Sequence, residues 1–396
     1  MRVLFLTHRL PYAPNRGDRL RAFHIARTLA TKVDLDLFSL THDHDEFNQA
    51  EPLRRLGVRV KAFPVPSVRN RLKAMVGLLG ERPLTHVLLD APGLLPSLAS
   101  AVRDRRPDVV LAYCSGMARF ALEPPLSGVP LVIDLVDVDS AKWSALAAAA
   151  PRPQRWIYQR ETRVLASFER EAATKAVVTF VVNERERRTL QDLAPGTSIQ
   201  ILPNGVDSAS LQPRQGPSSD GQVVFCGVMN YGPNVEGILW FASQVWPLIR
   251  AQRPGAFFSV VGSNPTHEIR RLASVERGID ITGTVSDVRP YLWNAAVSVA
   301  PLLTARGVQS KVMEAVAAGL PAVVTPQVFD GLPAELAPAC RVAHSPTAFA
   351  DHVSQLLALS GPERRGIAAG ADLACLSWES QLAPLYQALV GATGKS

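Results

Sequence analysis

Residues 301–324 read PLLTARGVQSKVMEAVAAGLPAVV, and this stretch decides the fold of the second half of the chain. An apolar strand ends at Pro301, and a loop that contains Gly307 leads into a helix that we expect to start near Val308. The run Gly319-Leu320-Pro321 ends this helix and begins the next apolar strand. A strand, a loop, a helix and a second strand in this order are typical of a parallel sheet covered by helices.

Lys311 and Glu314 are the residues of this helix that indicate chemistry. They lie three positions apart, which puts both on one helical face. Free backbone N–H groups at a helix start favour an anion, so this ammonium and this carboxylate can hold a diphosphate and a ribose diol respectively. The alternative is a surface Lys–Glu pair on an ordinary helix. Because the chain has only seven lysines against 35 arginines, we favour the functional interpretation.

The same alternation of apolar strands and amphipathic helices runs through the whole chain. In the first half we predict strands at Val3–Thr7, Val33–Ser39, Val58–Pro64, Val109–Tyr113, Leu131–Leu135, Ala176–Val182 and Ser198–Leu202, and a helix over 18–30. In the second half we predict strands at Val223–Gly227, Phe257–Val261, Asp280–Thr282, Ala296–Ala300, Ala322–Thr325 and Cys340–Ala343, and helices near 236–252, 266–276, 286–295, 309–318 and 347–358. The expected fold class is α/β, with two Rossmann-like doubly wound domains facing each other across a cleft.

A change in composition marks the boundary between the two domains. Residues 208–221 are rich in Ser, Pro, Gln and Gly, which is typical of a linker. We therefore predict one domain over 1–205, a second over 206–376, and a final amphipathic helix within 377–396.

Charge is distributed unevenly between the two halves. The formal net charge is +7, but residues 1–205 carry +8 and residues 206–396 carry −1. A basic first half fits a partner with negative charge, such as an anionic membrane face or a lipid diphosphate. Nucleic acid is not expected as a partner, because no DNA- or RNA-binding signature accompanies the charge.

The sequence has no signature of a membrane-spanning or disulfide-stabilised protein. No apolar run reaches the roughly 18–20 residues that cross a bilayer, and the apolar residues 1–6 are too few for a secretory signal. The four cysteines are far apart and show no C-x-x-C spacing. We expect a cytoplasmic protein, placed on the inner face of the membrane if it binds lipid.

Two segments of the first half combine basic and apolar side chains. Val68–Leu79 carries three basic residues ahead of an apolar run, and residues 152–168 carry four arginines with Trp156, Tyr158 and Phe168. Such segments suit peripheral membrane binding. The equal alternative is a helix with one core face and arginines that extend along its surface.

Several further motifs resemble the family 4, B-fold glycosyltransferases in the order in which that family has them. The resemblance covers nearly the whole chain. It implies a donor-binding C-terminal domain (206–376), an acceptor-side N-terminal domain (1–205) and a final helix that crosses back to the first domain. Besides 301–324, the motifs are PNGVD (203–207), FCGVMNYGPN (225–234), VVGSNP (260–265), ITGTVSDVRPYLWNAAVSVAPL (281–302) and SWES…LYQAL near the C-terminus.

A narrower resemblance concerns THRLPYAPNRGDRLRAFH (7–24), DLVDVDSAKW (134–143) and ARGVQSKVMEA (305–315). These stretches are similar to the sugar transferases associated with exosortase (PEP-CTERM) systems of exopolysaccharide synthesis in Gram-negative bacteria. The resemblance implies a retaining hexosyltransferase that moves a sugar from a nucleotide-diphosphate sugar to a hydroxyl of a lipid-linked glycan. It implies no metal and no other cofactor.

The family pattern is carried over residue by residue. Glu314 matches the second glutamate of a paired-glutamate motif, which holds the nucleotide ribose, whereas Arg306 stands where the first glutamate contacts the donor sugar. Val228 and Pro233 replace the usual basic pair of the first loop, so Arg306 and Lys311 become the expected cations for the donor phosphates. The predicted donor-binding residues are Gly17, Gly227, Asn230, Thr284, Val285, Gly307, Val308, Gln309, Lys311 and Glu314, and the predicted catalytic residues are Asp137, Arg306 and Lys311.

Asp134, Asp137 and Asp139 alternate at and just beyond a predicted strand end in the first domain. Three alternate carboxylates also suit a metal ion, but the resemblance implies a metal-free enzyme. We favour Asp137 as a group that orients the acceptor or acts as a weak base, with a helix cap as the competing interpretation.

Two other functions remain open at this stage. A nucleotide-sugar epimerase on the same fold would convert the donor without an acceptor. A non-catalytic scaffold of a polysaccharide assembly would keep the fold without the chemistry.

Overall fold

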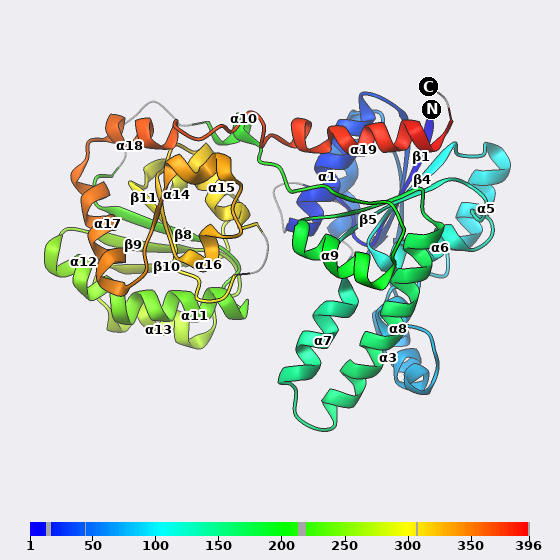
Figure 1. Cartoon of the computed structure of the whole chain (residues 1–396), viewed down its shortest axis with the longest axis horizontal. Helices are drawn as coiled ribbons and strands as arrows, with labels where there is room; N and C mark the ends of the chain where they lie inside the picture. The colour runs from blue at the N-terminus through cyan, green and yellow to red at the C-terminus, as the bar shows by residue number, and fades with distance from the viewer. Residues whose placement is uncertain (13–16, 44, 213–218, 306–307, 395–396) are drawn as a thin grey trace. The chain divides into compact units, whose positions relative to one another are not determined.

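The structure is a computed structural model that describes residues 1–12, 17–43, 45–212, 219–305 and 308–394. The chain forms two compact units, of which one comprises Met1–Pro203 with Gln381–Ser396 and the other comprises Asn204–Ser380 (Figure 1). Each unit is built on a parallel sheet with helices between the strands. The predicted fold class of two Rossmann-like α/β domains is therefore confirmed.

The first unit has its strands in the order β3-β2-β1-β4-β5-β6-β7, counted over the described residues. The order of growth reverses between β1 and β4, as in other doubly wound sheets. Helices cover both faces of such a sheet, which explains why β1 and β4 are buried along their whole length. The strands are β1 (Arg2–Thr7), β2 (Asp34–Thr41), β3 (Arg59–Pro64), β4 (Val109–Tyr113), β5 (Leu131–Val136), β6 (Val178–Val181) and β7 (Ile199–Ile201).

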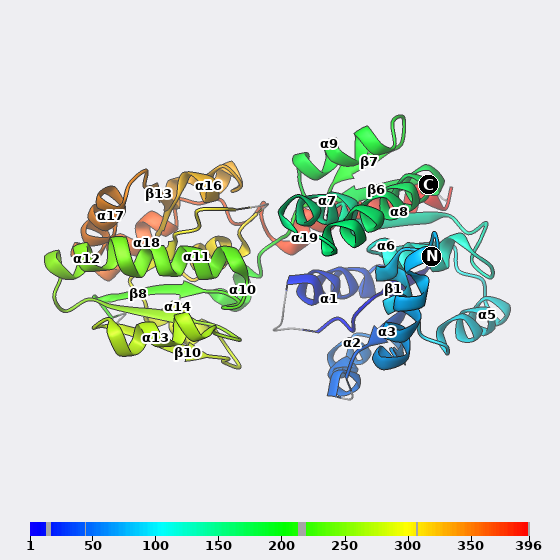
Figure 2. The same ribbon diagram turned by 90° about the horizontal axis from the view of Figure 1, so that it is seen from below.

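The helices of the first unit follow the apolar periodicity of the sequence. In α5, for example, Leu94, Leu98 and Ala101 recur at intervals of four and three residues and are buried. Two of the helices, α7 and α8, lie side by side as a hairpin (Figures 1 and 2). The helices are α1 (Gly17–Ala30), η1 (Asp45–Ala50), α2 (Glu51–Arg55), α3 (Ser67–Val76), η2 (Gly77–Leu79), α4 (Leu84–Leu88), α5 (Leu94–Asp104), α6 (Ser115–Leu122), α7 (Asp139–Ala149), α8 (Gln154–Lys175) and α9 (Glu184–Leu193).

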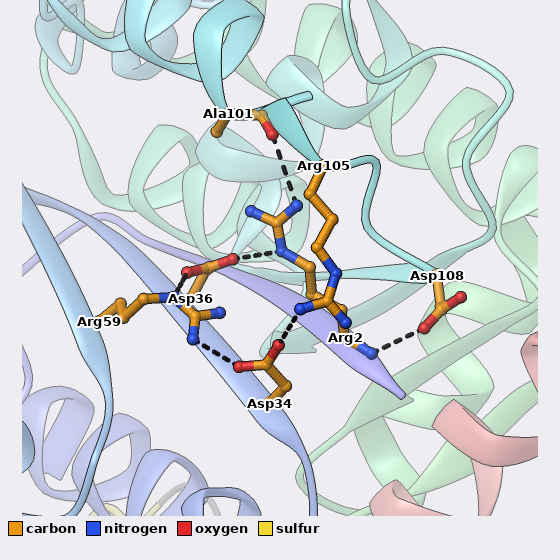
Figure 3. Close-up of polar contacts among 7 residues, drawn as sticks. All are labelled: Arg2, Asp34, Asp36, Arg59, Ala101, Arg105 and Asp108. Carbon is orange, nitrogen blue, oxygen red and sulfur yellow. Dashed lines mark hydrogen bonds and ion pairs between the residues drawn. The ribbon is translucent and has the colours of Figure 1, made fainter. Parts of the chain in front are cut away.

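A network of charged side chains lies at the amino-terminal ends of β1, β2 and β3 (Figure 3). Buried Asp36 accepts hydrogen bonds from Nε of Arg2 at 2.6 Å and from Nε of Arg59 at 2.5 Å. Asp34 accepts from Arg59 at 2.5 Å and from Arg105 at 2.7 Å, and its hydrogen bond with Arg59 holds the pKa of Asp34 below the ordinary value. We call these five residues the amino-end network. Since each carboxylate binds two guanidinium groups, the network ties β1, β2 and β3 together.

A second buried ion pair joins helix α1 to the carboxyl end of β5. Arg21 donates to the two carboxylate oxygens of Asp134 at 2.8 and 3.1 Å. The same guanidinium donates to the carbonyl oxygens of Leu202 at 2.8 Å and Pro203 at 3.2 Å. Arg21 therefore links Asp134 to residues 202–203, and both carboxylate oxygens of Asp134 accept hydrogen bonds from this guanidinium.

In the segment over 152–168, for which membrane binding was one prediction, two aromatic residues pack against other side chains of this unit. Tyr158 packs on Trp143 of α7, with ring centroids 5.2 Å apart. Phe168 packs on His86, with ring centroids 4.5 Å apart. Only Trp156 of these aromatics is strongly exposed, so the core-face alternative describes Tyr158 and Phe168.

The second unit repeats the doubly wound plan, with the order β10-β9-β8-β11-β12-β13 in the described part of the chain. Figure 1 shows α11 and α13 on one face of this sheet and α14 and α15 on the other. The strands are β8 (Gln222–Cys226), β9 (Phe257–Val261), β10 (Ile279–Gly283), β11 (Val297–Ala300), β12 (Ala322–Val324) and β13 (Cys340–Val342). The helices are α10 (Ser208–Leu211), α11 (Gly232–Trp240), η3 (Phe241–Val245), α12 (Trp246–Gln252), α13 (His267–Val275), α14 (Arg289–Asn294), α15 (Ser310–Ala317), α16 (Pro326–Phe329), η4 (Ala334–Ala339), α17 (Pro346–Ala358) and α18 (Gly361–Ala368).

Two local predictions in this unit were wrong. The helix expected over 236–252 already begins at Gly232, because Pro233 fits the first turn of a helix, and it contains the π-helical turn η3. The expected linker over 208–221 opens with helix α10, whose Leu211 is buried and accepts a hydrogen bond from Trp293 at 3.0 Å. Residues 213–218 lie outside the described residues.

The last helix, α19 (Trp378–Ala392), connects the two units, because the boundary lies at Ser380 and Gln381. Its Leu382, Leu385 and Leu389 are buried, and the ammonium of Lys32 lies 5.1 Å from the ring centroid of Tyr386. None of the helices in the described ranges is long and apolar enough to cross a membrane.

Candidate functional site

The topology of the second sheet locates the candidate site. The order of growth reverses between the neighbouring strands β8 and β11, and open α/β sheets bind ligands beyond the carboxyl ends of the strands at such a point. The chain leaves β8 through a loop that reaches α11, and it leaves β11 through the loop that reaches α15. The stretch 301–324 therefore begins where a ligand is expected.

Glycines let the loops after β8 and β9 approach each other closely. The N–H of Gly227 donates to the carbonyl of Val261 at 3.0 Å. A Cβ atom on Gly227 would lie 2.9 Å from Nδ2 of Asn234 and 3.4 Å from Nζ of Lys311. A Cβ atom on Gly262 would lie only 1.7 Å from the carbonyl oxygen of Gly227, so no other residue fits there. The predicted residue Gly227 thus lies directly beside Lys311, with no room for a side chain.

Lys311 is held by neutral groups. Its Nζ donates to Oδ1 of Asn234 at 2.6 Å and lies 4.5 Å from the ring centroid of Phe225. Asn234 is buried, and its Nδ2 donates to the carbonyl of Val228 at 2.8 Å, which fixes the amide. Within the described ranges, no carboxylate lies within ion-pair distance of this ammonium. A cation that the protein leaves without a counter-ion is suited to bind an anion.

Burial shifts both charged groups of α15 toward their neutral forms. It lowers the pKa of Lys311 to about 8, although electrostatic interactions with Cys226 and Glu314 oppose the shift. It raises the pKa of Glu314 to about 7, against the attraction of Lys311. Burial and the charge of Glu314 raise the pKa of the Cys226 thiol to about 12. The cost of burial therefore exceeds the mutual attraction of Lys311 and Glu314, and an anion bound beside Lys311 would favour its charged form.

The start of α15 adds backbone donors to these side chains. Gln309 is the N-cap residue and makes no side-chain cap hydrogen bond, so the first turn leaves N–H groups for a ligand. Val308 and Gln309 are both partly buried. The predicted residues Arg306 and Gly307 lie outside the described residues, and their roles stay predictions.

The remaining predicted donor residues lie in the loops that follow β8 and β10. Thr284 is exposed and Val285 partly buried, directly after the edge strand β10 and after Gly283, whose φ is +70°. Asn230 is exposed in the loop before α11. The contact to Lys311 comes instead from Asn234, in the first turn of α11, which the sequence did not lead us to predict. The available signal was a short amide side chain in the first turn of a helix that faces the loop after β8.

The predicted residues of the first unit are separate from this cluster. Gly17 is the first residue of α1. Asp137 accepts an ion pair from Lys142 at 3.0 Å, and Asp139 accepts from the same ammonium at 3.3 Å and from Ser115 at 2.9 Å. Although burial lowers it, the charges of Asp139 and Asp137 raise the pKa of Lys142 above the ordinary value. Helix α7 has Val138 as its N-cap residue, so Asp137 does not cap it.

Two family models match the chain, one in each unit. Residues 17–205 match the glycosyl transferase 4-like domain, and residues 220–359 match the group 1 glycosyl transferases. Together the two matches include the loop after β8, Lys311 and Glu314.

Solved structures of similar fold cover nearly the whole chain. Sucrose-phosphate synthase from Thermosynechococcus elongatus has 16% identity and a TM-score of 0.66, covering 99% of this chain and 100% of that chain. Anabaena HepE in complex with UDP-glucose has 13% identity and a TM-score of 0.64 with full coverage of both chains, 100% and 100%. The UDP-forming α,α-trehalose-phosphate synthase from Burkholderia vietnamiensis has 14% identity and a TM-score of 0.62, covering 98% of this chain and 99% of that chain. At these identities the likeness establishes the fold. No curated protein sequence matches the chain.

Proposed function

Since the chain is a glycosyltransferase built from a 4-like domain and a group 1 domain, we propose that it moves a sugar from a nucleotide-diphosphate sugar to a hydroxyl of a glycan, with retention at the anomeric carbon. The donor binds at the strand ends of the second unit. Similar structures that carry UDP-glucose or form UDP make uridine the first base to test.

One observation carries the proposal. The ammonium of Lys311 is largely buried against Gly227 and Phe225 and donates its hydrogen bond to an amide oxygen rather than to a carboxylate. Such a cation costs free energy in the empty protein, and a diphosphate would supply the missing charge. The uncapped start of α15 adds N–H donors to the same phosphates.

Glu314 supplies the second half of donor recognition. Its carboxylate lies on the same face of α15 as Lys311, and no described residue donates a hydrogen bond to it. We assign it to the ribose hydroxyls, which donate hydrogen bonds to an ionised carboxylate. Arg306, Gly307, Val308 and Gln309 are proposed to contact the phosphates and the sugar.

The bond between the anomeric carbon and the phosphate oxygen breaks as the bond to the acceptor oxygen forms on the same face of the sugar. The departing diphosphate takes the proton of the acceptor hydroxyl, so the step needs no strong protein base. Lys311 and the N–H groups of α15 stabilise the negative charge that develops on the diphosphate. The nucleoside diphosphate is the second product, and we expect no metal cofactor.

The acceptor is assigned to the first unit. We propose that Asp137, held by Lys142, accepts a hydrogen bond from the acceptor hydroxyl and orients it. The positive charge of residues 1–205 supports an acceptor linked to a lipid diphosphate at an anionic membrane. The resemblance to exosortase-associated transferases supports a role in exopolysaccharide synthesis on the inner face of that membrane.

The test is thermal unfolding of the purified chain with UDP, GDP, ADP and dTDP, beside Glu314→Ala. A nucleotide at 100 times its Kd adds about 2.7 kcal/mol to the stability of the protein that binds it. We expect one nucleotide to raise Tm in the wild type and to lose its effect in the variant. Glu335→Ala, which removes an exposed carboxylate elsewhere in this unit, serves as control. The donor assignment would be wrong if no nucleotide shifted Tm, or if Glu314→Ala kept the full shift.

A second measurement separates transfer from conversion of the donor. A transferase consumes the nucleotide sugar only when a glycan acceptor, or water in its place, receives the sugar. Conversion of UDP-glucose to an isomeric UDP-sugar without release of UDP would instead indicate the epimerase alternative.

A further inference from the structure

An apolar stripe faces solvent on α3 and η2, although helices of folded proteins normally turn such a stripe toward the core. Its members follow one another at intervals of four, three, one and three residues, which keeps them on one helical face. Their exposed fractions run from 62% for Leu72 to 91% for Leu79. The members of this apolar stripe are Val68, Leu72, Met75, Val76 and Leu79.

The opposite face of this segment holds it on the protein. Asn70 is buried, and its Nδ2 donates to the carbonyl oxygens of Leu88 at 3.1 Å and Asp90 at 2.8 Å. Arg160 of α8 donates to the carbonyl oxygen of Gly77, the first residue of η2, at 3.1 Å. Hydrogen bonds at Asn70 and Gly77 attach the segment to the rest of the unit. They hold it in an orientation that exposes the apolar stripe to solvent.

Basic residues flank the apolar stripe on both sides. At about 100° per residue, Arg69 and Lys73 lie along one side of the stripe and Arg71 along the other. All three side chains are exposed, and no acidic residue occurs from Ser67 to Gly80. An apolar face with positive edges is the pattern of helices that lie in the plane of a membrane interface.

Charge distinguishes the possible occupants of this surface. In a symmetric dimer the same patch of two copies would meet, which would bring Arg69, Arg71 and Lys73 of both copies into one interface without a counter-charge. Anionic headgroups attract each of these residues, and the acyl region accepts the apolar stripe. The observations therefore favour a lipid surface over a second copy.

We propose that α3 and η2 form an in-plane docking surface for an anionic lipid bilayer. The apolar stripe enters the boundary between headgroups and acyl chains, and the three basic residues contact headgroup phosphates. The hydrogen bonds of Asn70 and Arg160 connect this docking surface to the rest of the first unit. This docking surface rests on the proposed function, in which the acceptor is lipid-linked. It would bring the enzyme to the membrane that carries this acceptor.

The experiment measures binding of the full chain to vesicles of phosphatidylcholine alone and of phosphatidylcholine with phosphatidylglycerol, by flotation. The test variant combines Leu72→Gln, Val76→Gln and Leu79→Gln. The matched control combines Leu56→Gln, Leu146→Gln and Val275→Gln, which removes the same number of exposed leucine and valine side chains from scattered positions. A third variant combines Arg69→Gln, Arg71→Gln and Lys73→Gln.

We expect the wild type and the matched control to bind the anionic vesicles equally well. The apolar variant should bind them at least about tenfold more weakly, because it loses three of the five inserting side chains. The basic variant should lose the preference for anionic over neutral vesicles. Failure of the wild type to bind, or equal binding by the apolar variant, would overturn the proposal. A change from dimer to monomer in the apolar variant, with vesicle binding unchanged, would identify a second copy as the occupant and also overturn it.

Nucleotide binding separates this inference from the proposed function. The Tm shift with UDP is measured on the same four proteins without vesicles. Because the substituted side chains of α3 and η2 are exposed and remote in sequence from the donor site, all four should show the same shift. Vesicle binding without any nucleotide shift would remove the proposed function and leave the docking surface. A Tm shift with UDP but no vesicle binding would overturn the docking surface and leave the proposed function.

Discussion

In the amino-end network of the first unit, each carboxylate lies between two guanidinium groups, whereas the charges of α15 in the second unit have no ionic partner among the described residues. Asp36 accepts from Arg2 and Arg59 at 2.6 and 2.5 Å. Lys311 instead donates to an amide, and Glu314 has no described donor. Arg2 and Asp36 are buried, as Lys311 and Glu314 largely are, so burial alone does not separate structural from functional charge. The difference lies in whether the protein itself supplies the opposite charge.

The pKa values follow this difference. In the amino-end network the hydrogen bond from Arg59 holds the pKa of Asp34 below its ordinary value, so that carboxylate stays ionised. In α15, burial moves the pKa of Lys311 and that of Glu314 toward neutrality, to about 8 and about 7. A strongly shifted pair at the strand ends of a doubly wound sheet is typical of a binding site. Substitutions should therefore affect stability in the first case and ligand binding in the second.

Asp36→Asn should produce the largest effect. The change leaves the buried guanidinium of Arg2 without its ion-pair partner, and breaking a buried pair in this way costs about 3–5 kcal/mol. Urea unfolding measures the loss. Asp104→Asn removes the same charge from an exposed position at the end of α5 and should change the free energy of unfolding little. Equal losses in both variants would mean that net charge, not pairing, is responsible.

Lys311→Met should reduce turnover of the donor about 10²–10³-fold, because one charge that stabilises the leaving diphosphate is removed. Initial rates of nucleoside diphosphate release from UDP-glucose measure the effect. Lys175→Met, at an exposed ion pair with Glu171, is the matched control. Unlike Asp36→Asn, Lys311→Met should not destabilise the ligand-free protein. An undiminished rate would contradict the role of Lys311.

The pH dependence of kcat/KM should be bell-shaped. Glu314 must be ionised to accept the ribose hydroxyls, so binding is lost as pH falls through about 7. Lys311 must be protonated to hold the diphosphate, so binding is lost as pH rises through about 8. Glu314→Gln should lower kcat/KM near pH 7.5 by about tenfold and remove the acid limb. An acid limb that persists in this variant would belong to another group.

Asn234→Ala should weaken UDP binding by roughly fivefold to tenfold, the value of one hydrogen bond to a charged or neutral partner. The amide fixes the Lys311 ammonium at 2.6 Å, and its loss leaves that ammonium mobile. Isothermal titration measures the affinity. Asn230→Ala changes an exposed amide in the loop before α11 and should have the smaller effect. The reverse order would show that the exposed residue, not the buried one, serves the donor.

Glu314→Gln should have the smallest effect, a stabilisation of the ligand-free protein by about 1 kcal/mol at pH 8. The pKa of Glu314 rises from 4.5 to about 7 on folding. The folded protein therefore holds more protons than the unfolded chain between these values, and the wild type loses stability as pH rises through this range. Glutamine does not titrate, so the two proteins should be equally stable near pH 4. Destabilisation at pH 8 would mean that Glu314 has a protein partner after all.

Much of the fold was predictable from local pattern. The apolar runs at Val109–Tyr113 and Phe257–Val261 are buried on both faces of their sheets, apart from Phe257 at the start of the second run, and such runs are a property of sequence alone. The wrong predictions concern boundaries. Pro233 allowed the helix to begin at Gly232, and α10 formed where composition predicted a linker, because Leu211 found a place in the core.

The candidate site was predictable only in part. The spacing of Lys311 and Glu314 follows from helical periodicity, and the sequence alone therefore paired them on one face. The place of Gly227 beside Lys311 and the amide of Asn234 that holds the ammonium depend on tertiary packing, since Asn234 of α11 and Lys311 of α15 are 77 positions apart in the chain. No local pattern encodes such a contact.

The sequence by itself determined the alternation of strands and helices, the two sheets and the helix that carries Lys311 and Glu314, because these depend on residues within a few positions of one another. The tertiary structure decided which charges are paired. It paired Asp134 with Arg21 and Asp36 with Arg2 and Arg59, left Lys311 with an amide, and turned the apolar stripe of α3 and η2 outward. These outcomes depend on distances between segments far apart in the chain and on the cost of burying charge, which only the folded arrangement sets.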